Sequence, residues 1–211
     1  MYLYSRGFRI LRNVEESRRV YGEILRLVND NAGVEMHAWA SAFSASPNTM
    51  VFTAMVESRQ DVMEATQKLA LVPEFGSLVE SMRSNVTPPV DAFRWVLNAD
   101  KIDMSGGPKP VANVMSAQIV GDLGKAFEWS LEMAEFSGAL TGTQVAVTVN
   151  TVGPMGQINW MAGVDDMDAV DAAEMALWSD PGYMERMATA RAAGFFGSGP
   201  GATGGSVFVR V

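Results

Sequence analysis

Cysteine is absent from this 211-residue chain. Its absence excludes disulfides, thiolate metal sites and cysteine nucleophiles together. Basic clusters are also scarce: the net charge is −8, and Lys and Arg residues stand singly among acids apart from Arg18 and Arg19. A polyanionic partner would need a basic stripe on one face of the protein, so nucleic-acid binding is disfavoured.

Long apolar runs are missing as well. No stretch approaches the length of a membrane span. The N-terminal segment MYLYSRGFRI carries Arg6 and Arg9 within its apolar residues, which is unlike a signal peptide. We therefore expect no membrane partner and a cytoplasmic protein. Hydrophobic residues still make up 48% of the chain and charged residues 19%, a composition typical of a globular protein with a real core.

The second half of the chain repeats the first at a spacing of 108 residues, which relates Pro73 to Pro181 (181 − 73 = 108). The same step relates Leu69 to Leu177, Ala65 to Ala173, Val62 to Val170, Phe75 to Tyr183, Phe52 to Trp160 and Tyr21 to Trp129. This shared register predicts a duplication without a gap from the first helix to the fifth element. The glycines and prolines of DMSGGPKP mark a linker. The predicted domains are a first repeat over 1–102, the linker 103–110 and a second repeat over 111–211.

Each half shows the same order of elements. In the first, YLYSRGFRIL is typical of a strand, Asn13 opens a helix, and VEMHAWASAF and MVFTAMVES are two strands joined by the hairpin SASPNT. A second helical region runs from Ser58 to about Met82 with a break near Pro73, and AFRWVL closes the unit. The second half matches with NVMSAQIV, a helix around 126–136, TQVAVTVNTV, the hairpin GPMG, QINWMAGV, a helix around 169–193 and SVFVRV. The pattern predicts an α+β protein with the order βαββαβ twice.

This order, and a second helix interrupted at a small-Pro-x-aromatic turn in each half, resemble the dimeric α+β barrel superfamily. The two turns are Val72-Pro73-Glu74-Phe75 and Asp180-Pro181-Gly182-Tyr183. The superfamily includes antibiotic-biosynthesis-type monooxygenases, haem-degrading monooxygenases, stress-responsive barrels and chlorite-dismutase-like proteins. The resemblance implies two ferredoxin-like βαββαβ repeats whose antiparallel sheets pack as an intramolecular dimeric α+β barrel. It implies a fold and not a reaction.

His37 is the only histidine, and Glu35 and Trp39 share its strand face by two-residue alternation. A carboxylate, an imidazole and an indole on one face could move a proton beside an aromatic substrate or supply a haem ligand. A histidine satisfied by hydrogen bonds, with Trp39 in the core, is the more common arrangement. Glu35 and His37 are therefore the candidate catalytic residues, and Trp39 is a candidate ligand-binding residue.

Further candidates lie on other strands. Asn159 is one of several polar residues on second-half strands that otherwise look buried, and Trp160 adjoins it. Such groups need partners, which are a ligand, ordered water or one another. Arg94 and Arg210 lie in the last strands of the two halves, where they could clamp an anion or lie at an exposed sheet edge. We take Arg94, Asn159 and Trp160 as candidate ligand-binding residues.

We expect neither a cofactor nor a metal. By the resemblance, chlorite-dismutase-like proteins place their haem-ligating histidine in the second repeat, which here has no histidine. Asp165, Asp166 and Asp168 lie at a strand-to-helix junction, where aspartates cap helices. The glycine-rich segment 197–205 follows a helix and precedes a strand, the reverse of the order in a phosphate-binding loop.

Two functions stay open. The chain is a small-molecule binding or scaffold module with a small apolar ligand, or it is a cofactor-independent monooxygenase or isomerase-like enzyme acting on an apolar aromatic or polyketide-like compound. A homo-oligomer is also open, because exposed sheet edges can pair. The facing of the second strand is ambiguous by one residue: the 108-residue step matches His37 to Val145, whereas the polarity pattern matches Met36 to Val145.

Overall fold

The computed structural model describes residues 1–44, 46–103, 105–198 and 202–211, and it divides by compactness into two units. The first unit comprises residues 1–94 and 209–211, and the second comprises residues 95–208. The described residues form six α-helices and eight strands, so the predicted α+β class is confirmed. None of the described helices combines the length and the apolar character needed to cross a membrane.

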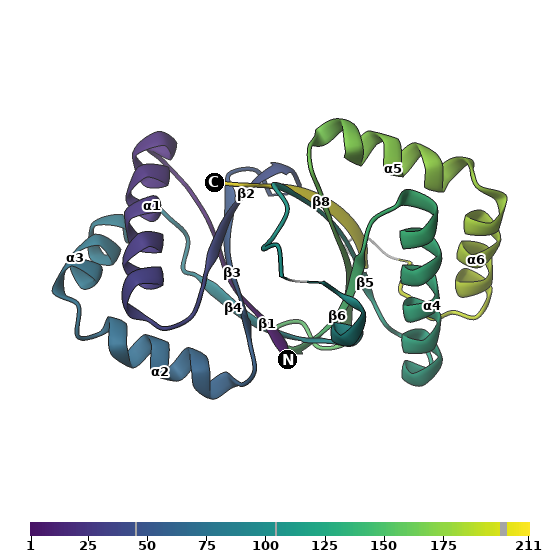
Figure 1. Cartoon of the computed structure of the whole chain (residues 1–211), viewed down its shortest axis with the longest axis horizontal. Coiled ribbons are helices and arrows are strands. Elements are labelled where there is room, and N and C mark those ends of the chain that lie inside the picture. The colour runs from purple at the N-terminus through teal and green to yellow at the C-terminus, as the bar shows by residue number, and fades with distance from the viewer. Residues whose placement is uncertain (45, 104, 199–201) are drawn as a thin grey trace. The chain divides into compact units, whose positions relative to one another are not determined.

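The first unit is a sheet with three helices on one face (Figure 1). Its elements are β1 (Tyr2–Arg9), α1 (Val14–Asn31), β2 (His37–Phe43), β3 (Thr49–Val56), α2 (Arg59–Leu69), α3 (Pro73–Met82) and β4 (Val90–Val96). The strand order is β4-β1-β3-β2, and β3 pairs antiparallel with both of its neighbours. The predicted break near Pro73 is confirmed, because this proline, which has no N–H to donate, occupies the first turn of α3.

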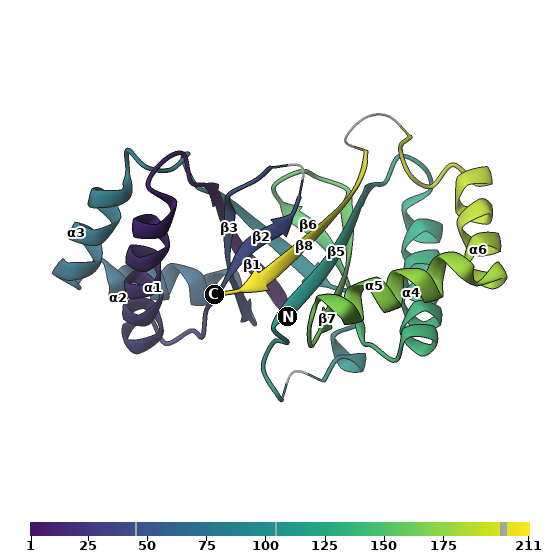
Figure 2. The ribbon, with the colours of Figure 1, turned by 90° about the horizontal axis from the view of Figure 1, so that it is seen from above.

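The second unit repeats this order of elements, and Figure 2 shows its three helices together on one side of its strands. Its elements are the short 3-10 helix η1 (Ala99–Lys101), β5 (Val111–Gln118), α4 (Leu123–Thr141), β6 (Val145–Val152), β7 (Gln157–Val164), α5 (Met167–Ser179), α6 (Pro181–Ala192) and β8 (Thr203–Arg210). The strand order is β8-β5-β7-β6. Asp166 accepts a hydrogen bond from the first turn of α5, which confirms a capping role for this member of the predicted acidic run, and Asp180 does the same for α6.

The division by compactness falls inside two strands, β4 and β8. The last three residues of the chain belong to the first unit, where the N–H of Val211 donates to the carbonyl of Ala38. The repeat boundary at 103–110 describes a sequence repetition and not compactness, so it stays a prediction.

The strand registers correct the alignment of the two halves. Trp39 pairs with Val51 in the first unit, and Thr148 pairs with Asn159 in the second. Val51 and Asn159 are 108 residues apart (159 − 51 = 108), but Trp39 and Thr148 are 109 apart (148 − 39 = 109). The repeat therefore shortens by one residue in the hairpin, which spans 44–48 in the first unit and 153–156 in the second.

This correction changes which residues are equivalent. The prediction of a gap-free register, with Tyr21 matched to Trp129, is wrong, because the two hairpins differ in length. With the longer step of 109 residues, Met36 matches Val145, as the polarity pattern predicted. The buried residues of α1 then match those of α4: Ser17 with Ala126, Tyr21 with Ser130, Ile24 with Met133, and Val28 with Ser137.

Candidate functional site

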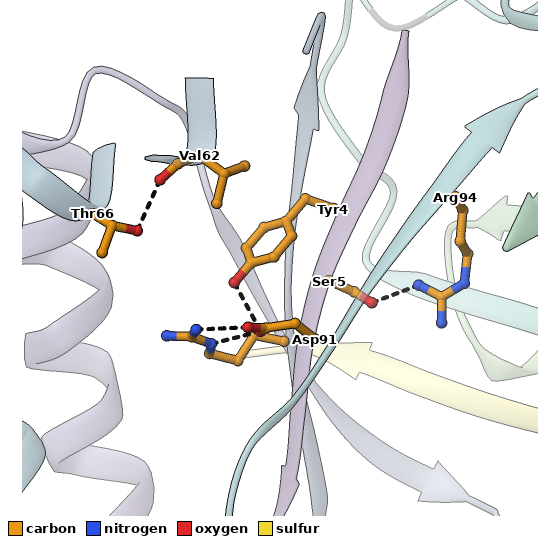
Figure 3. A network of polar contacts seen from close by, with 7 residues as sticks. Tyr4, Ser5, Val62, Thr66, Asp91 and Arg94 are labelled. Carbon is orange, nitrogen blue, oxygen red and sulfur yellow. Dashed lines mark hydrogen bonds and ion pairs between the residues drawn. The ribbon is translucent and has the colours of Figure 1, made fainter. Parts of the chain in front are cut away.

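Each sheet has one face that packs against the helices of its own unit and one that does not. We call the second the helix-free face. In β1, Phe8 packs against Tyr21 of α1 with ring centroids 4.3 Å apart, so Ser5 and Gly7 lie on the opposite face by alternation. Figure 3 shows Tyr4 and Ser5 on opposite sides of this strand.

A row of four polar side chains crosses the helix-free face of the first unit. Thr53 pairs with Ser5 on one side and with His37 on the other, and the guanidinium of Arg94 donates to Ser5 Oγ (Figure 3). We call Arg94, Ser5, Thr53 and His37 the polar row. Neighbouring strands lie about 4.8 Å apart, so the row spans roughly 14 Å of sheet. Trp39 Nε1 donates to Thr53 Oγ1 at 2.8 Å, which ties the indole to the same row.

Arg94 is a charged member of the polar row whose partner among the described residues is neutral. It is partly buried, and this burial lowers the pKa of its guanidinium. Its one hydrogen bond goes to a neutral hydroxyl, and no carboxylate in the described part of the chain lies within ion-pair distance of it. Buried charges are normally paired, because desolvation is costly. Arg94 therefore keeps donors that an anion could use.

His37 combines partial burial with two nearby charges. Burial lowers the pKa of its imidazole, Glu35 raises it and Arg210 lowers it, with a net decrease below 6.5. The imidazole is consequently neutral at pH 7 and able to accept a proton. Glu35 Oε1 lies 3.7 Å from His37 Nε2, while the Glu35 side chain is 80% exposed. The structure thus brings the two candidate catalytic residues together and places Trp39 on the same face as His37.

Glu35 also lines a hollow of about 330 Å³ at the surface of the first unit. Its other polar walls include Glu57, Glu64 and Lys68. His37 and Trp39 do not line this hollow. Glu35 therefore lies between His37 and this surface hollow.

The structure separates Asn159 from Trp160. Trp160 packs on the helix side of β7, 6.0 Å from Trp129 between ring centroids, and its Nε1 donates to the carbonyl of Ser130. Asn159 lies on the helix-free face, accepts from Ser116 Oγ at 2.8 Å and donates to Thr148 Oγ1 at 3.3 Å. Neighbours in a strand point to opposite faces, so one pocket cannot take both side chains.

Asn159 belongs to a set of polar residues on the helix-free face of the second unit. We call this set the polar ladder: Ser116, Asn159, Thr148, Gln118, Gln157 and Asn150. The amide of Asn150 donates to Gln157 Oε1 and to the carbonyl of Pro154, and Gln118 donates to the carbonyl of Met155. Among the described residues, one buried side-chain oxygen lacks a partner, Asn150 Oδ1. The ladder is otherwise held by its own hydrogen bonds.

Sequence reasoning missed Ser5 and Thr53, because hydroxyl residues in a strand carry no motif. It also missed Asp91, which lies on the helix side of the first sheet. Asp91 accepts from Tyr4 at 2.9 Å and from Arg6 at 2.7 and 2.8 Å (Figure 3). Burial tends to raise the pKa of Asp91, but its bonds with Arg6 and Tyr4 outweigh burial and lower it. This group is fully paired, so it has the character of a structural contact.

No protein-family model matches the chain, and no curated protein matches it. Solved structures do. An anthrone oxidase-like protein is 11% identical with a TM-score of 0.66 and covers 100% of this chain and 91% of its own. A candidate monooxygenase from Lactobacillus acidophilus NCFM is 11% identical with a TM-score of 0.62, covering 100% and 94%. A mutant chlorite dismutase from Candidatus Nitrospira defluvii is 11% identical with a TM-score of 0.54, covering 98% and 90%.

These similarities show the fold alone, and the predicted resemblance is confirmed at the level of the fold. They show no functional site. The one histidine of the chain, His37, lies in the first unit, so the second unit offers no histidine ligand. Among the described residues no group of three or more His, Asp and Glu side chains could hold a metal ion.

Proposed function

We propose that the first unit binds a small organic anion on its helix-free face, with Arg94 as the anion-binding group. The observation that carries this proposal is a partly buried guanidinium bonded to a single hydroxyl, with no acid beside it among the described residues. A carboxylate or phenolate would supply the missing charge and accept the remaining N–H groups in a forked geometry.

The surroundings of Arg94 indicate that the rest of the ligand is apolar. Trp39, Val51 and Ala92 lie on the same face, by strand register and by alternation along β4. The proposed ligand is therefore a compact apolar molecule with one anionic group. In this proposal the two units are ferredoxin-like repeats of which the first binds the ligand and the second, whose polar ladder is largely satisfied internally, acts as scaffold.

The test compares Arg94→Leu with Arg94→Lys in the full chain, using 2-naphthoate as the probe and calorimetry as the readout. We expect Arg94→Leu to weaken binding by about 100-fold, because a charge-assisted pair is lost, and Arg94→Lys to weaken it by about tenfold. Arg26→Leu is the matched control, since Arg26 lies on the exposed face of α1 and pairs with Asp30. Equal affinity in Arg94→Leu and the wild type would refute the proposal.

A second candidate function is cofactor-independent oxygenation at the same site. The neutral His37 imidazole favours it, because a base on the same face as Arg94 could remove a proton from carbon while Arg94 stabilises the resulting oxyanion. The balanced reaction converts a CH₂ group and O₂ into a carbonyl and water, and the substrate supplies the electrons. An isomerase-like enzyme would use the same proton transfer and consume no O₂.

Anthrone is the substrate of choice for this test, with oxygen uptake as the readout. The oxygenase hypothesis predicts uptake that falls at least tenfold in His37→Gln, while 2-naphthoate still binds that variant. Binding without oxygen uptake in the wild type would leave the chain a binding module.

A further inference from the structure

Gly7 lies in the middle of β1, where nothing in the fold requires a glycine. Its φ is not among the positive values of the described glycines, and the pairing of β1 with β3 runs from Tyr2 to Arg9 without a bulge. An added Cβ would come no closer than 3.8 Å to any atom, the nearest being Met50 O and Val51 Cγ2. A glycine inside a strand weakens that strand, and it often marks a place where a ligand approaches closely.

The position of Gly7 links it to the proposed anion site. It follows Ser5 on the helix-free face, and its register partner Val51 pairs in turn with Trp39. Ala92, another small residue, lies two positions from Arg94 on the same face of β4. Gly7 itself is partly exposed. Beside the polar row, the helix-free face thus carries small or apolar residues, with Trp39 across Val51 from Gly7.

The second unit fills the equivalent place. Gly7 pairs with Val51 as Ser116 pairs with Asn159, so Ser116 is the equivalent residue (116 − 7 = 109). The Ser116 hydroxyl donates to Asn159 Oδ1 and completes the polar ladder. The fold therefore accepts a side chain at this position, and its absence in the first unit leaves space on the face that carries Arg94.

We propose that Gly7 determines which anions the site accepts: a flat aromatic ring lies against Gly7 while its carboxylate or phenolate binds Arg94. This inference rests on the proposed function and adds a specificity-determining residue to it. A bulky side chain at position 7 would displace a flat ring but leave the Arg94 guanidinium free to bind a slim anion.

The experiment measures the affinity of 2-naphthoate and of hexanoate for the wild type, Gly7→Ala and Gly7→Val. The wild type is expected to bind 2-naphthoate more tightly than hexanoate. Gly7→Val should weaken the binding of 2-naphthoate at least tenfold, since one or two misplaced methyl groups have effects of that size in an apolar pocket. It should change the affinity for hexanoate by less than about threefold. Gly204→Val, at an exposed glycine of β8 with nothing within 4 Å of an added Cβ, is the control.

Thermal unfolding separates a ligand-binding role from a structural one. Valine forms strands more readily than glycine, so Gly7→Val should raise the Tm by about 2 °C while it weakens the binding of 2-naphthoate. A glycine kept for packing would lower the Tm instead. If the valine variant does not fold, Gly7→Ala takes its place, with a loss of 2-naphthoate affinity of at least about threefold expected.

Three results would overturn the inference. The wild type could bind the two anions equally, or the position-7 variants could retain full affinity for 2-naphthoate. The third result is a position-7 variant whose affinities for both anions fall together. If 2-naphthoate affinity is retained at position 7 but lost in Arg94→Leu, Gly7 has no role and the anion site stands. If Arg94→Leu also retains it, the proposed function fails as well.

Discussion

The helix-free faces of the two units carry polar side chains at different positions. In the second unit, Ser116, Asn159 and Thr148 form one rung of mutual hydrogen bonds. The equivalent residues of the first unit are Gly7, Val51 and Trp39. The polar row of the first unit, which ends in Arg94, lies instead two positions away along each strand on the same face. The comparison teaches that polar side chains that bond to one another stabilise the sheet, whereas a partly buried charge without an acidic partner favours the binding of an anionic ligand.

The largest stability effect should come from the polar ladder. Asn159→Leu removes two hydrogen bonds at a buried position and leaves the hydroxyls of Ser116 and Thr148 without that partner. We expect a loss of about 2 to 3 kcal/mol in the free energy of unfolding, measured with urea. Affinity for 2-naphthoate should not change in the folded variant. A stability loss below 0.5 kcal/mol, on the order of a surface substitution, would contradict the structural role of the ladder.

A smaller loss is expected at Asp91, which accepts hydrogen bonds from Tyr4 and Arg6 in the first unit. Asp91→Asn should cost about 1 to 2 kcal/mol, a value reduced for the partial exposure of the pair. The folded pKa of Asp91 is lowered, so its contribution is complete above the ordinary value of 3.8 and disappears as the pH falls through the folded pKa. Urea unfolding of both proteins should converge in acid; a difference that grows below pH 3.8 would contradict this origin.

The two hairpins offer a further contrast. Gly156 has a φ of 74°, and an added Cβ would lie 2.8 Å from Gln118 Nε2, whereas Asn48 reaches a φ of 59° with its side chain in place. Gly156→Ala should destabilise the protein by about 1 to 2 kcal/mol, and Asn48→Gly should stay within about 0.5 kcal/mol. Thermal unfolding of both variants provides the measurement, and equal shifts in Tm would show that the shorter hairpin is not the more constrained one.

The finest distinction concerns His37, which matches Ala146 in the second unit. Its NMR titration should give a pKa below 6.5, a further decrease in Glu35→Gln and an increase in Arg210→Gln. Because the folded pKa is the lower one, the unfolded chain binds the proton first, and the His37 contribution lowers stability as the pH falls from 6.5 toward the folded pKa. A pKa above 6.5 would remove the argument for a neutral base.

Much of the fold could be predicted from the sequence, because strand alternation, helix periodicity and the breaks at Pro73 and Pro181 are local signals. The one-residue hairpin difference could not, since the identical residues among the matched pairs, such as Pro73 with Pro181, all follow the hairpin and a shift inside a loop leaves no trace in composition. For the site, Arg94 and His37 stood out as rare residue types in strands. The grouping of Asn159 with Trp160 ignored the alternation of strand neighbours, and Gly7 passed as part of an apolar run.

The most direct test of the difference between the two units is the stoichiometry of 2-naphthoate binding by calorimetry, in the wild type, Arg94→Leu and Asn159→Leu. The account predicts one site per chain, abolished or strongly weakened in Arg94→Leu and unchanged in Asn159→Leu. Two equivalent sites per chain, or a single site that survives in Arg94→Leu and disappears in Asn159→Leu, would contradict it.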